Sequence, residues 1–195
     1  MEWMIIVTWL ARIILLVLVG MSVFTLSIIL ERREFFNKNS LTADIPKLLT
    51  FCEENKISEM ESYLNKENIF MDQILGAFDR NMGLQIHSGI NLLKYKNQEE
   101  GKLSLLGTFG STAPFIGLLG TVFGIIVAFG ELSLGKVDSN SIMFALAEAL
   151  ILTAVGLMVA IPSVISFNHY SRKLKIERER VRTIQELIFN HHHLN

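Results

Sequence analysis

Glu148, Thr121 and Thr153 are the residues whose types and positions could carry protons through a membrane. Glu148 is the one acidic residue within the apolar runs 103–129 and 142–167. A carboxylate in such a run costs several kcal/mol unless it faces protein, water or a partner, so it favours a proton or cation path. The alternative is that Glu148 only hydrogen-bonds a neighbouring helix or pairs with a basic group of another subunit.

The two threonines are expected at the same depth in the membrane. Each lies 16 residues from residue 137, the centre of the turn between the two apolar runs. Because a helix rises about 1.5 Å per residue, both hydroxyls should lie near the middle of the bilayer. One acid and two hydroxyls form a thin relay, which indicates that the main proton carrier belongs to another chain.

Each threonine lies within a stripe of small residues spaced three or four apart, which a helix places on one face. In lipid, small residues allow helices to approach closely. The stripes therefore predict either a helix–helix seam or the wall of a narrow pore, and the matched threonines with Glu148 favour the pore. The first stripe comprises Gly107, Gly110, Pro114, Gly117, Thr121, Gly124 and Ala128, and the second Ala145, Ala149, Thr153, Gly156, Ala160 and Ser163.

Three apolar segments, at about 3–30, 103–132 and 142–167, predict an all-α membrane protein. In the first, Ile13–Leu30 gives 18 residues without a charge, enough to cross roughly 30 Å of hydrocarbon. No small-residue cleavage pattern follows it, so we expect a retained anchor rather than a signal peptide. We expect a short interfacial helix up to Trp9 and an Arg12 side chain that snorkels to the surface. The alternative makes Arg12 a charge inside the membrane.

Charged residues gather in two regions that we expect to be helical and cytoplasmic. Regions 31–102 and 170–195 carry ten and six Lys or Arg residues, and Arg12 and Lys136 are the only others. By the positive-inside rule, both regions are cytoplasmic, and the N-terminus and the turn at 133–142 lie outside. Apolar residues recur at helical spacing in region 31–102, notably at Ile69, Ile74, Leu75, Phe78, Met82, Ile86, Ile90 and Leu93.

The same period continues after the third apolar segment, at Leu174, Val181, Ile184 and Ile188. The third helix should therefore extend well beyond the bilayer. The sequence predicts four parts: an N-terminal interfacial and first transmembrane helix (1–33), a cytoplasmic helical region (34–102), a hairpin of two transmembrane helices (103–169) and a cytoplasmic C-terminal helix (170–195).

Composition argues against several other classes of protein. The net charge of −1 is unlike that of a nucleic-acid binder. The single cysteine, Cys52, excludes an internal disulfide and any cysteine-based metal site. No nucleophile–base pair, Walker loop or metal-ligand spacing is present, and the glycines of the first stripe lie in an apolar helix rather than after a strand. We therefore expect no enzyme activity, no cofactor and no metal.

Two blocks of the sequence resemble the MotA/TolQ/ExbB proton-channel family. The first is Gly107–Gly124, with the sequence GTFGSTAPFIGLLGTVFG. The second runs from AEAL at Ala147–Leu150 through TAVGL at Thr153–Leu157 to AIP at Ala160–Pro162. The short chain and three spans are similar to the ExbB and TolQ branch rather than to the four-span flagellar stator protein.

The resemblance implies a homopentamer in the bacterial inner membrane, with a periplasmic N-terminus and a cytoplasmic C-terminus. The second and third helices would line a central pore that holds the single transmembrane helices of an ExbD- or TolR-like dimer, whose aspartate carries the proton. It also implies that Thr121, Thr153 and Glu148 stand at the family's functional positions. The complex would convert proton-motive force into work on TonB or TolA, for outer-membrane transport or envelope integrity.

Two other interpretations remain open at this point. Within the family, the chain could be a stator subunit of another proton-driven motor, of the flagellar or gliding type. Outside it, the chain could be a structural membrane scaffold whose small-residue stripes are seams only.

Overall fold

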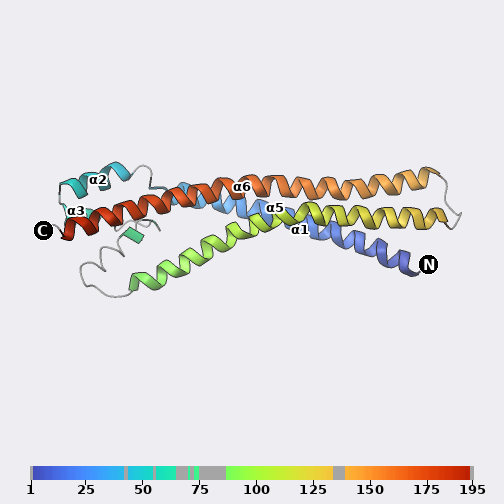
Figure 1. Cartoon of the computed structure of the whole chain (residues 1–195), viewed down its shortest axis with the longest axis horizontal. Coiled ribbons are helices and arrows are strands. Elements are labelled where there is room, and N and C mark those ends of the chain that lie inside the picture. Colours follow the sequence, from blue (N-terminus) through green and yellow to red (C-terminus); the bar gives the residue numbers. More distant parts are fainter. Residues whose placement is uncertain are drawn as a thin grey trace. The chain divides into compact units, whose positions relative to one another are not determined.

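Every element in the described part of the chain is an α-helix in the computed structural model (Figure 1). The helices are α1 (Glu2–Asn39), α2 (Ile45–Glu53), α3 (Ile57–Leu64), α5 (His87–Ser133) and α6 (Ser139–His193). The structure describes residues 2–41, 44–54, 56–64, 70, 73–74, 87–133 and 139–193. The centre of the turn expected at 133–142 (residues 134–138) and most of the helical period expected at 69–93 lie outside these residues, and the last part of that expected turn, from Ser139, already belongs to α6.

Three helices are long and apolar enough to cross a membrane. They are Met4–Asn39, Glu100–Ser133 and Ile142–Leu187, with mean hydropathy values of 2.9, 2.1 and 2.3 in their most apolar windows. The three apolar segments and the all-α class predicted from the sequence are thus confirmed. The third helix also continues past residue 170 as expected, because α6 ends only at His193.

The first helix differs from its prediction at the N-terminal end. α1 runs without a break through Trp9 and Arg12, so no separate interfacial helix ends at Trp9. The physical reason is local: no glycine or proline occurs between residues 2 and 19, and nothing else in this stretch favours a turn over a helix. Arg12 therefore lies within a continuous helix rather than at the end of a separate one.

The chain forms two compact units. The first unit combines Met1–Leu30 with Leu103–Asn168, and the second combines Glu31–Lys102 with His169–Asn195. The first unit holds the apolar parts of α1, α5 and α6, and it contains the candidate functional residues. The second holds the charged ends of the same three helices together with α2 and α3.

The first unit has a small core because its helices present their large apolar side chains outward. Its core residues are Ile14, Leu18, Met21, Ala113, Leu152, Val159 and Ala160. In contrast, Phe115 on α5 is 70 % exposed and Phe144 on α6 is 74 % exposed. An outward apolar surface of this kind suits a lipid environment, where packing rather than water exclusion holds helices together.

Polar contacts hold the second unit together. The buried Glu177 on α6 accepts hydrogen bonds from the Ser40 hydroxyl (3.1 Å), the Leu41 backbone N–H (3.4 Å) and Arg180 (3.0 Å). Nearby, the ring of Phe36 stacks on that of Tyr170 with centroids 5.6 Å apart. These contacts fasten the end of α1 to α6.

Candidate functional site

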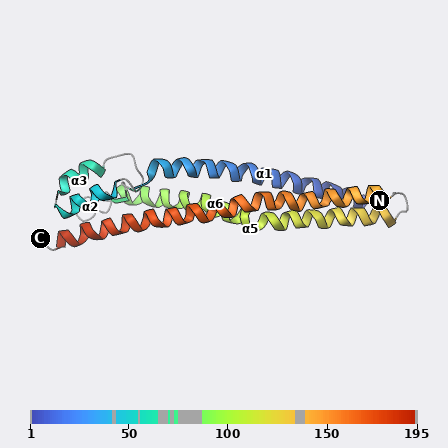
Figure 2. The same cartoon turned by 90° about the horizontal axis from the view of Figure 1, so that it is seen from above.

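The backbones of α5 and α6 touch along the two stripes of small residues. A Cβ atom added to Gly117 would lie 2.7 Å from the carbonyl oxygen of Leu152 and 3.1 Å from the Cα of Thr153. A Cβ at Gly156 would lie 2.7 Å from the carbonyl oxygen of Ala113. The two distances of 2.7 Å are shorter than real Cβ contacts, so only glycine fits on either side of this crossing. Figures 1 and 2 both show α5 and α6 side by side here.

The contact continues along the helices in both directions from Gly117. A Cβ at Gly124 would lie 2.5 Å from the Cβ of Ala149, and one at Gly110 would lie 2.6 Å from a methyl group of Val164. The remaining stripe residues are buried or half-buried: Gly107, Pro114, Thr121, Ala128, Ala145, Thr153, Ala160 and Ser163. Close packing of α5 on α6 within one chain is thus enough to explain why these positions hold small residues. Their assignment to a pore wall stays a prediction.

The two threonines lie in this seam but differ in their hydrogen bonds. Thr121 is 6 % exposed, and its hydroxyl donates to the carbonyl of Leu118, 2.8 Å away. The buried hydroxyl oxygen of Thr153 has no hydrogen-bond partner within the described part of the chain. Thr121 is therefore satisfied by its own helix, whereas Thr153 keeps its full capacity to donate and accept.

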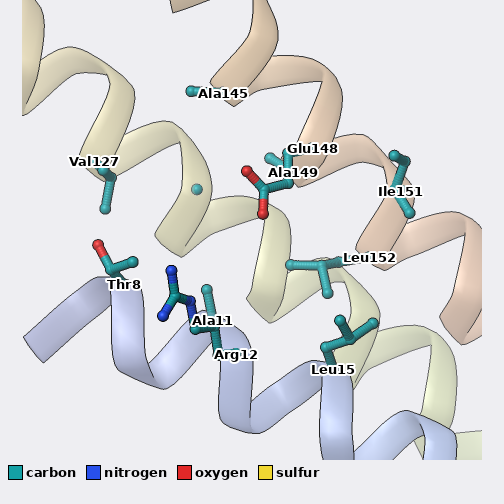
Figure 3. A pocket seen from close by; sticks show the side chains of 11 residues that line it. Thr8, Ala11, Arg12, Leu15, Val127, Ala145, Glu148, Ala149, Ile151 and Leu152 are labelled. Atoms are coloured by element: carbon teal, nitrogen blue, oxygen red, sulfur yellow. The ribbon is translucent and has the colours of Figure 1, made fainter.

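Glu148 lies apart from the threonines, at a pocket of about 180 Å³ formed by three helices. Figure 3 shows its carboxylate pointing into this pocket from α6 while the guanidinium of Arg12 points into it from α1. Neither Thr121 nor Thr153 is among the described residues that line it. The lining residues are Thr8, Ala11, Arg12, Leu15, Gly124, Val127, Ala145, Glu148, Ala149, Ile151 and Leu152.

Arg12 was missed as a site residue by sequence reasoning. The sequence raised the possibility of a charge inside the membrane, but it predicted a side chain that snorkels to the interface. In the structure the Arg12 guanidinium carbon lies 5.7 Å from the ring centroid of Trp9, one turn earlier, and the side chain also lines the Glu148 pocket. The signal that could have found it was the pairing of one intramembrane base with one intramembrane acid.

No group of three or more His, Cys, Asp or Glu side chains that could hold a metal ion is present among the residues that the structure describes. The groups available for chemistry at the pocket and in the seam are the carboxylate of Glu148, the guanidinium of Arg12 and the hydroxyls of the seam threonines. The carboxylate can bind and release a proton, the hydroxyls can donate and accept hydrogen bonds, and the guanidinium keeps its positive charge.

Comparison with known proteins adds an independent observation. A model of the MotA/TolQ/ExbB proton channel family matches residues 79–183. An ExbB-like biopolymer transport protein of Helicobacter pylori is 49 % identical over 76 residues, which are 38 % of this chain and 51 % of that protein. The biopolymer transport protein ExbB of Xanthomonas campestris pv. campestris is 48 % identical over 71 residues, 36 % of this chain and 28 % of its own length.

A relative named TolQ, rather than ExbB, matches over a stretch of similar length. The Tol-Pal system protein TolQ of Pseudomonas aeruginosa is 44 % identical over 75 residues, 38 % of this chain and 32 % of its own length. The chain thus spans about half the length of the Helicobacter relative and less of the other two. The matches to relatives named ExbB and TolQ place the chain in the ExbB/TolQ branch of the family. Together with the three apolar helices, these matches support a multi-pass membrane protein.

Proposed function

The chain belongs to the MotA/TolQ/ExbB proton channel family, and we propose that it is a proton-channel subunit that converts proton-motive force into mechanical work. In this proposal it acts with an ExbD- or TolR-like single-span partner, and the work is done on a TonB- or TolA-like protein. The complex serves outer-membrane transport or envelope integrity. Five copies of the subunit form a homopentamer in the bacterial inner membrane, and the central pore of this pentamer holds the partner's helices.

The observation that carries the proposal is the position of Glu148. It is the one acidic residue in the apolar runs 103–129 and 142–167, and it lines a pocket instead of forming an ion pair with another described residue. An uncompensated carboxylate in a membrane span is expensive, and function is the usual reason for its presence. The unpaired hydroxyl of Thr153 provides a second group that can accept and pass a proton.

The charge distribution supports one orientation. The regions rich in Lys and Arg, 31–102 and 170–195, lie in the cytoplasm, and the N-terminus and the α5–α6 turn lie in the periplasm. Glu148 then lies on the periplasmic side of Thr153, because it comes earlier in a helix that runs inward. Protons driven by the membrane potential meet Glu148 before they reach the level of the threonines.

Proton flux into proteoliposomes that contain the chain and its single-span partner tests the proposal. We expect Glu148→Gln and Thr121→Ala to lower the flux at least tenfold, with the helical content of the complex unchanged. The matched control is Glu131→Gln, which removes an acid near the end of α5, beyond the apolar run 103–129, that does not line the Glu148 pocket. Wild-type flux in both Glu148→Gln and Thr121→Ala would refute the channel assignment.

A structural scaffold is the second candidate, and the α5–α6 seam favours it. The contact of Gly117 with Gly156 explains the small stripes without any pore. A scaffold is expected to form the same complex and to show no flux above that of empty vesicles, whichever acid is replaced. Mass measurement of the purified complex, made on the same samples, establishes whether the assembly is intact in each variant.

A further inference from the structure

Arg12 and Glu148 bring opposite charges to one pocket from helices that are far apart in the sequence. Figure 3 shows the guanidinium and the carboxylate directed into the same space, and neither forms an ion pair with another described residue. The guanidinium lies over the ring of Trp9, 5.7 Å from its centroid. Among the described residues that line the pocket, no other side chain carries a charge.

The remaining walls of the pocket offer Glu148 no other cation. α5 contributes Gly124 and Val127, and α6 contributes only apolar side chains besides Glu148 itself. From α1 the second polar group is Thr8, whose hydroxyl already donates to the carbonyl of Met4 at 2.9 Å. Among the described residues that line the pocket, Arg12 is thus the single group that can compensate a negative charge on Glu148.

The free-energy cost of an unpaired charge in the membrane predicts when the Arg12 guanidinium and the Glu148 carboxylate should form an ion pair. An ionised carboxylate in a membrane span is strongly destabilised unless a cation or water reaches it, whereas a protonated one is not. Arginine keeps its charge under all conditions, and its long, flexible side chain allows the guanidinium to move between Trp9 and a partner in the membrane span. The cation–π contact with Trp9 gives the guanidinium a resting position when the acid is neutral.

We propose that Arg12 is the counter-ion of Glu148, pairing with the carboxylate across the pocket when the acid has lost its proton and returning toward Trp9 when it is protonated. The proposal rests on the function proposed above for Glu148 and extends it to α1. Arg12 is here a positioning residue: it holds the ionised carboxylate toward α1 and takes no proton itself. The first helix thereby senses each change in the protonation of Glu148.

A double-mutant cycle measured by thermal unfolding tests the pairing without any transport assay. The full chain is reconstituted in lipid nanodiscs as wild type, Arg12→Gln, Glu148→Gln and the double variant, at alkaline pH. We expect Arg12→Gln to lower the midpoint by about 2–4 °C when Glu148 is present and not to lower it in the Glu148→Gln background. The matched control is Arg33→Gln, which removes an exposed cation of the same helix and should have no such dependence on Glu148.

Two further measurements separate a charge effect from a packing effect. Arg12→Lys should keep most of the wild-type midpoint, while Arg12→Met, which inserts readily because it removes a charge from the span, should behave as Arg12→Gln does. The effect of Arg12→Gln should also fade as the pH is lowered and Glu148 takes up its proton. Equal effects of Arg12→Gln in both backgrounds, or at every pH, would overturn the pairing.

Proton flux on the same variants distinguishes this inference from the proposed function. If Arg12 and Glu148 are coupled but the complex shows no flux, the Arg12–Glu148 interaction is supported and the channel function is refuted. Flux that depends on Glu148 without any coupling to Arg12 would retain the channel and reject the counter-ion. If both hold, Arg12→Gln should displace the pH profile of the flux, whereas Arg33→Gln should leave it unchanged.

Discussion

Replacement of Gly117 by alanine is the most direct test of the α5–α6 seam. The added Cβ would lie 2.7 Å from the carbonyl oxygen of Leu152 and 3.1 Å from the Cα of Thr153. Both atoms belong to backbone, so no side-chain rotation can relieve the contact and the helices themselves must move. The contact would have to open by roughly 0.7 Å to reach 3.4 Å, where ordinary van der Waals contact begins.

The energy of this opening can be estimated from packing. A radial gap of about 0.5–1 Å forfeits a quarter to a half of the dispersion energy of each atom pair across it. Over-packing of a close contact typically costs about 1–3 kcal/mol. Gly20→Ala on α1 is the matched control, because a Cβ there has no described atom within 4 Å. Both substitutions gain the same helix propensity, about 1 kcal/mol, so their difference isolates the cost of the clash.

Thermal unfolding of the two variants in the same nanodiscs measures that difference. For a chain of this size, about 1 kcal/mol corresponds to 2–4 °C, so Gly117→Ala should unfold roughly 2–12 °C below Gly20→Ala. Gly156→Ala should behave as Gly117→Ala does, since its Cβ would lie 2.7 Å from the carbonyl oxygen of Ala113. Equal midpoints for Gly117→Ala and Gly20→Ala would show that the seam is not packed as described.

Two further predictions concern polar contacts within each unit. In the first unit, Ser163→Ala should cost about 1–3 kcal/mol because it strands the buried hydroxyl of Thr25, 3.0 Å from Ser163 Oγ, and adding Thr25→Val should recover much of the loss; chemical unfolding of the single and double variants measures this. In the second unit, Glu177→Ala should cost about 1.5–3 kcal/mol, because Ser40, Leu41 and Arg180 all donate to its buried carboxylate. Glu179→Ala, at a side chain 65 % exposed and 3.9 Å from Lys175, should change stability by less than about 0.5 kcal/mol in the same assay, and a similar loss in both variants would argue against the Glu177 contacts.

The features that depend on position along a helix could be predicted from the sequence. Hydropathy alone located the three apolar helices, because a span of given thickness needs a given number of apolar residues. The spacing of the small residues likewise predicted which faces of α5 and α6 would lack large side chains. The seam around Gly117 and Gly156 is the contact that such faces favour in lipid.

The features that depend on rotation between helices could not be predicted in the same way. Counting from the turn placed Thr121 and Thr153 at one depth, but it did not determine the direction in which Glu148 points. That direction depends on how α1 packs against α5 and α6, in the core cluster that contains Ile14 and Leu18 of α1 and Leu152 of α6. Arg12 and Glu148 are brought together by these long-range contacts, for which a single sequence carries no periodic signal.

The seam and the proposed proton path depend on the same contact. The hydroxyl of Thr153 is buried without a partner because α5 packs against α6 at its level, where the Cα of Thr153 is 3.1 Å from the Cβ position of Gly117. A tight seam keeps this hydroxyl away from lipid and free of other bonds, since the glycine opposite offers no polar side chain. A Cβ at Gly117 would open the seam at that level and change the surroundings of Thr153. Close packing thus maintains a polar group that lipid could not solvate and that a proton path could use.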